Sequence, residues 1–219
     1  MKRIDFYLDF ISPYAWLAFE RLPLALEGVS YEVTYRPVLL AALLERQQPG
    51  QPGPAEVAGK REWTYRHALW LAHTHGIDMR LPARHPFNPL DALRLAWACA
   101  RQGAPNRHVC EAILRHIWTT GADAQDAARL NALAAQLAPA HDPASAAIKE
   151  QLRTQTEAAA SSGVFGVPAF VADGRLFWGL DALPMLRAHL LQEGALDAIW
   201  EAPAGVQWDG RASRRLVGA

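Results

Sequence analysis

The feature that most constrains the fold lies near the start of the chain, where a strand pattern runs directly into a helix start. Apolar side chains alternate with polar or amphipathic ones over residues 4–11, which is the period of a half-buried β-strand. Ser12 and Pro13 follow at once, and they suit an N-cap and the first position of a helix. Because free backbone N–H groups and the positive end of the helix dipole meet there, an anion is stabilised at Ser12, whether phosphate, carboxylate or thiolate.

A second strand pattern and a C-terminal hairpin complete the expected framework. Residues 31–36 alternate like the first strand and follow the first helix, which predicts two parallel strands with a right-handed helical connection. Near the other end, the runs 166–172 and 175–178 flank Asp173-Gly174, a pair typical of a tight type I′ turn. A last helix is expected to follow, with Asp181 as its N-cap.

The long middle of the chain is predicted to be helical. Apolar residues recur at helical spacing in three stretches between residues 90 and 137, and a further helix is expected from Asp142-Pro143 to Gly163. The predicted fold class is therefore α/β with a large all-helical insertion. Its expected parts are a sheet framework at 1–37 and 163–200, a helical insertion at 38–162, and a C-terminal tail at 201–219.

The order of these elements, and the residues at their joints, resemble the thioredoxin fold in its DsbA-like form. Redox members of that fold place Cys-x-x-Cys where a strand meets its following helix, and a cis-proline begins the third strand. Here Ser12-Pro13-Tyr14-Ala15 stands in the first place and Val167-Pro168 in the second. Because both cysteines are absent, dithiol exchange through this motif is excluded, and any thiol chemistry must use a sulfur from another molecule.

Three separated segments resemble the 2-hydroxychromene-2-carboxylate isomerase family, whose close relatives are the kappa-class glutathione transferases. These segments are residues 6–14, 163–168 and 176–181, and the similarity extends over nearly the whole chain. The resemblance implies a kappa-class architecture and glutathione as cofactor. It implies that glutathione lies beside Ser12, pairs its backbone at Val167 and Pro168, and has its γ-glutamyl end near Trp178, Gly179, Leu180 and Asp181.

Elementary chemistry then favours Ser12 as a hydrogen-bond donor to the cofactor sulfur. A thiol with a pKa near ~8.5 is about 3% ionised at neutral pH, and lowering that pKa by about two units would leave most of it as thiolate. As a nucleophile, Ser12 would need a nearby general base, and its motif contains no histidine. Structural alternatives stay open: Ser12 as an ordinary N-cap, Pro168 as a simple strand start, and Asp181 as a helix cap.

Three polar side chains of the helical insertion are candidates for binding the second substrate. Lys60 is the first candidate to bind a carboxylate or to polarise a carbonyl, although a helix lysine is usually a solvated surface residue. Arg84 and Asn88 lie in a proline-broken loop before a helix, where Asn88 could simply cap. The resemblance supports a substrate-binding role for each of the three.

Composition limits the classes of partner. The 219 residues include 22 Lys plus Arg and 22 Asp plus Glu, so nothing predicts a nucleic-acid partner. Aspartates interrupt the apolar run near the N-terminus and no long apolar span follows, so we expect a cytoplasmic protein without membrane contact. His73 and His75 lack further ligands at suitable spacing and predict no metal site, and Cys99 and Cys110 are expected to be buried or free thiols.

Three functions are consistent with these residues. The first is a glutathione-dependent isomerase of an aromatic hydroxy-acid, working by reversible thiolate addition, bond rotation and elimination. The second is a kappa-like glutathione transferase with the same site, whose product would retain the thioether. The third is a non-catalytic thioredoxin-like binding module. The oligomeric state is left open, although relatives in this family are often homodimers.

Overall fold

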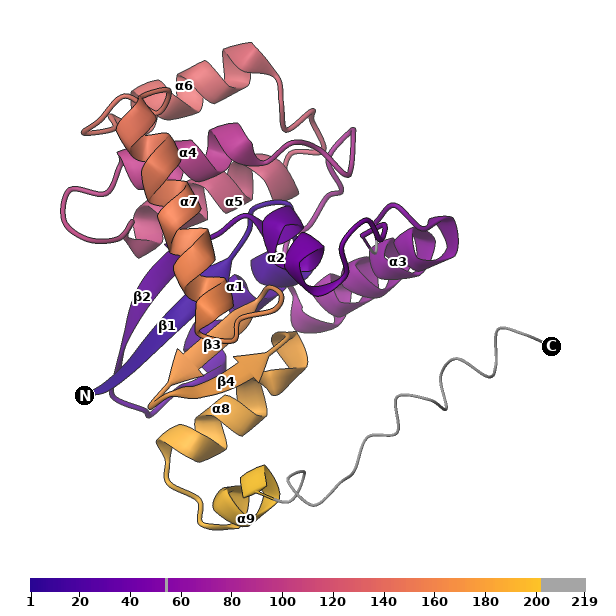
Figure 1. Cartoon of the computed structure of the whole chain (residues 1–219). Coiled ribbons are helices and arrows are strands. Elements are labelled where there is room, and N and C mark those ends of the chain that lie inside the picture. Colours follow the sequence, from indigo (N-terminus) through magenta and orange to yellow (C-terminus); the bar gives the residue numbers. More distant parts are fainter. Residues whose placement is uncertain (54, 202–219) are drawn as a thin grey trace.

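The chain folds around a small sheet with helices on both of its faces (Figure 1). The structure is a computed structural model that describes residues 1–53 and 55–201. The strands are β1 (Lys2–Leu8), β2 (Tyr31–Pro37), β3 (Ala169–Ala172) and β4 (Arg175–Trp178). The helices are α1 (Pro13–Ala25), α2 (Leu40–Gln47), α3 (Ala58–His75), α4 (Leu90–Ala98), α5 (Arg107–Trp118), α6 (Ala127–Leu137), α7 (Ala146–Ser161), the 3₁₀ turn η1 (Leu180–Ala182), α8 (Leu183–Leu190) and α9 (Ala195–Glu201).

The sheet is mixed, with strand order β2-β1-β3-β4. β1 pairs with β2 in parallel, as a connection through α1 predicts. β3 is antiparallel to both of its neighbours, and Ala169 lies opposite Tyr7 of β1 and Trp178 of β4. Asp173 and Gly174 join β3 to β4 with positive φ at both residues, as a type I′ turn requires. The strand-helix-strand unit and the hairpin predicted from the sequence are both present.

The two faces of the sheet pack into different apolar clusters. Phe6 of β1, Phe170 of β3 and Phe19 of α1 belong to the larger cluster, and the rings of Phe6 and Phe170 lie 4.5 Å apart between centroids. The smaller cluster contains Val38, which follows β2, and Ala159 near the end of α7. Because successive strand residues point to opposite faces, the alternation in β1 allows the sheet to be covered on both sides.

Helices α2 to α7 all fall between β2 and β3 in the sequence and form the predicted all-helical insertion. In Figure 1, α4, α5 and α6 gather beyond one end of the sheet, α3 extends to one side, and α7 returns toward β3. α7 contacts α2, α4 and β2, so it connects the inserted helices to the sheet. Within the described residues, none of the helices combines the length and hydrophobicity needed to cross a membrane.

Three predicted boundaries near the motif segments are wrong. β3 begins at Ala169 rather than at residue 166. β1 ends at Leu8 rather than at residue 11, because the Asp9 carboxylate accepts the N–H of Ile11 within the following loop and the N–H of Leu40 at the start of α2. Asp181 is not the N-cap of the last helix. It lies within η1, and α8 begins two residues later, after Ala182, which makes no side-chain cap bond.

The start of α7 also differs from the prediction. Asp142 does not begin a helix, because its carboxylate accepts the N–H of Ala144 at 2.8 Å in a local turn. The helix begins at Ala146, and Ser145 is its N-cap. Of the expected tail at 201–219, residues 202–219 lie outside the described residues.

Candidate active site

The register of the sheet brings the three motif segments to one end of it. β3 runs antiparallel to β1, so its first residue, Ala169, lies near the end of β1 that leads to Ser12. Pro168 therefore lies at that end too. Ala169 is also opposite Trp178, the last residue of β4, which adds residues 178–181 to the same region. Segments separated by more than a hundred residues in the sequence thus converge beyond one end of the sheet.

Ser12 is the N-cap of α1 and is only 5% exposed. Its backbone is extended, with φ −86° and ψ 117°, and its Oγ accepts the N–H of Ala15 at 3.2 Å. Pro13 occupies the first helical position. The cap uses a lone pair of Oγ, so the hydroxyl proton remains free to be donated to an anion at the helix terminus. The structural role of Ser12 as a cap is therefore compatible with the expected role as a donor.

A fully buried carboxylate organises the backbone before Ser12. Asp9 accepts the N–H of Ile11 through Oδ1 at 3.1 Å and the N–H of Leu40 through Oδ2 at 2.8 Å. These bonds join the connection between β1 and α1 to the start of α2. Burial raises the pKa of Asp9 from its ordinary value of 3.8 to about 7, while the backbone donors act in the opposite direction. The loop before Ser12 is thus held by hydrogen bonds to a carboxyl group whose pKa lies near neutral pH.

Two further side chains bind carbonyl groups of the same loop. Trp118 of α5 donates from Nε1 to the carbonyl oxygen of Phe10 at 3.0 Å, and His85 donates from Nε2 to that of Ile11 at 2.8 Å. The other ring nitrogen of His85, Nδ1, lies 2.8 Å from the hydroxyl of Tyr65 in α3. Burial lowers the pKa of His85 below its ordinary value, which favours the neutral imidazole, while the bond to Ile11 acts in the opposite direction. The inserted helices therefore contact the loop that leads into Ser12.

The proline corner and the segment after β4 are joined directly. The Val167–Pro168 peptide is cis, and the carbonyl oxygen of Pro168 accepts the N–H of Gly179 at 2.9 Å. Gly179 has a φ of 99°, a conformation that disfavours other residues. A Cβ at this position would also overlap Oδ1 of Asp181. Glycine is thus needed both for the local backbone and for the placement of the Asp181 carboxylate.

An exposed aromatic pair borders this corner. Trp178 is 55% exposed, and its ring lies 5.0 Å from that of Phe165 between centroids. A Cβ on Gly166 would approach Nε1 of Trp178 to 2.9 Å, so the glycine allows the indole to lie against the backbone there. Gln47 at the end of α2 donates to the carbonyl oxygen of Phe165 at 2.5 Å. The loop before the cis-proline is therefore held by both the hairpin and the insertion.

The three candidate substrate-binding residues have surface positions. Lys60 is exposed in the first turn of α3. Arg84 is 80% exposed and forms an ion pair of 3.4 Å with Asp123. Asn88 accepts the N–H of Leu90 through Oδ1 at 3.0 Å in a local turn before α4, and the N-cap of that helix is Pro89, so the capping role considered for Asn88 is wrong. No hydrogen bond or ion pair recorded for the described residues joins any of the three to Ser12.

The sequence alone did not indicate Asp9 or His85, whose side chains hydrogen-bond to the backbone of the loop before Ser12. In the sequence, Asp9 is only a polar position in an alternating strand pattern. A sharper signal was its place at the junction itself, where short carboxylates commonly bond to backbone N–H groups. His85 lies between Arg84 and Pro86, in the loop that was already suspected, but nothing in its neighbourhood along the chain indicates a partner at Ile11.

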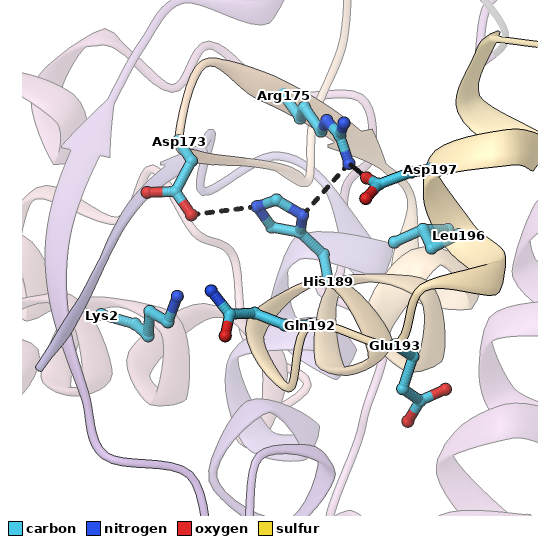
Figure 2. Close-up of a pocket in the computed structure, with 8 residues that line it drawn as sticks. All are labelled: Lys2, Asp173, Arg175, His189, Gln192, Glu193, Leu196 and Asp197. Atoms are coloured by element: carbon cyan, nitrogen blue, oxygen red, sulfur yellow. Dashed lines mark hydrogen bonds and ion pairs between the residues drawn. The ribbon is translucent and has the colours of Figure 1, made fainter.

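A separate hollow of about 300 Å³ lies beside the turn of the β3–β4 hairpin (Figure 2). His189 stands at its centre, 3.1 Å from the Asp173 carboxylate and 3.5 Å from the Arg175 guanidinium, which also pairs with Asp197 at 2.6 Å. None of the candidate site residues lines this hollow. The turn lies at the opposite end of β4 from Trp178, so the hollow is distinct from the site at Ser12.

Comparison with known families identifies the family of the fold. A family model described as a DSBA-like thioredoxin domain matches residues 3–191. The chain belongs to the DsbA-like thioredoxin family. The fold class expected from the sequence, with its helical insertion, is thereby confirmed. In this DsbA-like protein, Ser12 and Ala15 stand where the sequence resemblance expects the two cysteines of a Cys-x-x-Cys relative.

Within this family, the chain is similar to isomerases and to kappa-class glutathione transferases. This DsbA-like protein is 29% identical to a 2-hydroxychromene-2-carboxylate isomerase of Sphingobium xenophagum over 204 residues, covering 87% of the chain and 98% of the relative. It is 26% identical to glutathione S-transferase kappa 1 of Rattus norvegicus, covering 87% and 91% respectively. A solved 2-hydroxychromene-2-carboxylate isomerase superposes with a TM-score of 0.74 at 22% identity, covering 94% of this chain and 100% of that structure. The resemblance stated from the sequence motifs is confirmed.

Proposed function

We propose that this protein is a glutathione-dependent isomerase of an aromatic hydroxy-acid, of the type that converts 2-hydroxychromene-2-carboxylate to trans-o-hydroxybenzylidenepyruvate. The observation that carries the proposal is the hydroxyl of Ser12 at the N-terminus of α1, where redox relatives have a cysteine. A serine there cannot exchange disulfides, but it can stabilise a thiolate supplied by another molecule. The names of the relatives point to the same class of reaction.

The residues at this end of the sheet fit a γ-glutamyl tripeptide thiol. Ser12 combines a free hydroxyl proton with a helix N-terminus, which favours a thiolate. The backbone of Val167 lies two residues before β3, where an extended peptide can add as a short strand. Asp181 offers a carboxylate suited to an ammonium group, and Gly179 leaves the space in which that carboxylate sits. One bound tripeptide would thus find a partner for its sulfur at Ser12, for its backbone at Val167 and for its amino group at Asp181.

When bound, glutathione supplies a thiolate that adds reversibly to a conjugated carbon, so that the substrate can rotate about a single bond before the thiolate leaves. Ser12 donates its hydroxyl proton toward the sulfur and holds it ionised between turnovers. Lys60 is proposed to bind the substrate carboxylate or the negative charge that develops on the carbonyl oxygen. Arg84 and Asn88 are proposed to bind the same substrate from the loop before α4. No net oxidation or reduction is required.

A kappa-like glutathione transferase is the second candidate, and the similarity to the rat kappa-class enzyme favours it. The same thiolate would attack an electrophile that carries a leaving group. The two activities differ in their products, because a transferase retains the thioether whereas an isomerase returns free glutathione. Quantifying free glutathione after turnover of each substrate class separates them.

The test is calorimetric titration of glutathione into the wild type, Ser12→Ala and Ser145→Ala across pH 6 to 9. Ser145 caps α7 by accepting the N–H of Ile148 at 3.3 Å, so its substitution removes a comparable N-cap far along the chain. We expect each variant to lose about 1 kcal/mol of unfolding free energy. Only Ser12→Ala should weaken the release of protons on glutathione binding, because only that variant lacks the donor to the sulfur.

The outcomes distinguish the three functions. Proton release that depends on Ser12, followed by turnover of hydroxychromene carboxylates with glutathione recovered, supports the isomerase. Proton release with thioether product supports the transferase. No binding of glutathione or of a glutathione analogue at millimolar concentration contradicts both, and it favours a non-catalytic binding module.

A further inference from the structure

We propose that His85 is a positioning residue for Ser12, acting through the carbonyl group of Ile11. The inference rests on the proposed function for its effect on the cofactor. Its structural part rests only on the hydrogen bonds of the loop. His85 comes from the helical insertion, and Ile11 immediately precedes the N-cap of α1, so the contact couples two regions far apart in the sequence.

The hydrogen-bond partners assign the proton on His85. The carbonyl oxygen of Ile11 can only accept, so Nε2 of His85, at 2.8 Å from it, must carry a proton. In the neutral ring, Nδ1 then accepts the hydroxyl proton of Tyr65 at 2.8 Å. In the protonated ring, Nδ1 donates to that hydroxyl, which in turn donates to the His85 carbonyl oxygen at 2.9 Å. The bond to Ile11 is kept in both protonation states.

The bond reaches Ser12 because the carbonyl of Ile11 and the N–H of Ser12 belong to one planar peptide unit. His85 holds the oxygen side of this unit, and the carbonyl oxygen of Asp9 accepts the N–H of Ser12 at 3.0 Å on the other side. With the peptide fixed at both ends, the backbone of Ser12 is fixed at the point where it enters α1. The direction of the Ser12 hydroxyl depends on that orientation.

The surroundings of His85 hold its ring in place. Its centroid lies 5.7 Å from the Trp118 ring and 5.8 Å from the Phe87 ring, and Trp118 is itself bonded to the neighbouring carbonyl of Phe10. The ionisable side chain bonded to His85 is Tyr65, whose pKa is raised by burial, so it remains neutral at physiological pH. His85 therefore acts as a fixed donor rather than as a group that exchanges protons with the substrate.

Two substitutions separate the donor from the bulk of the side chain. His85→Gln keeps an N–H at about the position of Nε2, whereas His85→Leu keeps volume and removes the donor. His116→Leu is the matched control, because His116 is another partly buried histidine, and its Nε2 is buried without a hydrogen-bond partner. Thermal unfolding of each variant establishes that it is folded.

We expect His85→Leu to accelerate amide hydrogen exchange at Ser12 and to weaken glutathione binding about tenfold, the size expected for one lost buried hydrogen bond. His85→Gln should restore both quantities to within about twofold of the wild type. The pH dependence of turnover should be the same in His85→Gln and in the wild type. ¹⁵N NMR of the ligand-free protein should show a protonated Nε2.

The positioning role of His85 and the proposed function would be contradicted by different results. Equal exchange at Ser12 in His85→Leu and wild type, or an unprotonated Nε2, contradicts the positioning role even if glutathione binds normally. Loss of one limb of the pH profile in His85→Gln would make His85 a catalytic acid or base instead. Failure of the wild type to bind glutathione contradicts the proposed function, and the exchange measurement then still decides whether His85 orders the loop.

Discussion

The N–H of Gly179 donates to the carbonyl oxygen of Pro168 across 2.9 Å. This bond joins the corner before β3 to the segment after β4, and each was assigned to a different part of glutathione. A tripeptide lying along this end of the sheet would contact both segments at once. Changes at Gly179 should therefore affect ligand binding more than their effect on stability alone would suggest.

Gly179→Ala should reduce glutathione affinity at least tenfold, because its Cβ would overlap Oδ1 of Asp181 and displace the carboxylate. Gly163→Ala is the control, since Gly163 also has a positive φ, of 89°, but a Cβ there meets nothing within 4 Å. Gly163→Ala should lose about 1 kcal/mol of stability from its positive φ. Gly179→Ala should lose about 1 to 3 kcal/mol, because its backbone, with φ 99° and ψ 163°, lies in a region essentially restricted to glycine. Equal effects of the two substitutions on glutathione binding would count against a role for Asp181.

Stability should fall as pH rises through the range in which Asp9 ionises. Its folded pKa of about 7 exceeds its ordinary value of 3.8, so the folded protein holds a proton that the unfolded chain has already released. The stabilising contribution is fully present below pH ~4 and is lost as pH rises through about 7, and it amounts to roughly 4 kcal/mol at most. Urea unfolding of the wild type over this range measures the slope.

Asp9→Asn should flatten that slope, because the asparagine does not titrate. It should also cost about 1 to 3 kcal/mol at low pH, since one of the two N–H groups bound by Asp9 would face the amide nitrogen. Asp5→Asn is the control, because it removes a partly exposed carboxylate that pairs with Arg36. It should leave the pH dependence of the unfolding free energy unchanged. A slope that survives in Asp9→Asn would assign the titration to another group.

Lys60→Ala should raise the KM for a carboxylate substrate about tenfold and leave glutathione affinity unchanged, if Lys60 binds the carboxylate. Lys149→Ala removes an exposed lysine from α7 and serves as the control for loss of one surface charge. Steady-state kinetics with each substrate varied in turn give both constants. Identical kinetics in Lys60→Ala and Lys149→Ala would remove Lys60 from the site.

The local hydrogen bond of Asn88 can be tested separately from its proposed role in substrate binding. Asn88→Ala should lower the unfolding free energy by about 1 kcal/mol through loss of the hydrogen bond to the N–H of Leu90. Asn88→Asp keeps that acceptor and should keep the stability, but its negative charge should repel a carboxylate substrate and raise KM. Normal kinetics in folded Asn88→Asp would leave Asn88 with the structural role alone.

Much of the framework could be predicted because its signals are local. The alternating strands, the Ser12-Pro13 start of α1 and the Asp173-Gly174 turn are each determined by neighbouring residues, and the structure has all of them. Element boundaries were less predictable where short polar side chains compete for the same backbone groups. Asp142 forms a turn and Ser145 forms the cap, although either residue type suits an N-cap.

The candidate site was only partly predictable for a related reason. The motif residues could be named from their order along the chain, and the sheet register accounts for their convergence. The contacts of Asp9 to Leu40 and of His85 to Ile11 depend on how the inserted helices fold back, which no local pattern encodes. Such partners lie tens of residues apart and become visible only in three dimensions.

The absence of cysteine from the Ser12-Pro13-Tyr14-Ala15 segment affects how the protein withstands alkylation and oxidation. The two cysteines of the described residues are a fully buried Cys110 and a partly buried Cys99, and burial raises the pKa of both thiols. Under the proposed function, the reactive sulfur leaves with its carrier and is replaced from solution. An alkylating agent or peroxide that permanently disables a dithiol relative would consume a replaceable molecule here. The capacity for turnover would then depend on the supply of reduced glutathione in the cell. It would not decline as oxidative or alkylating damage accumulates on an active-site cysteine of the protein.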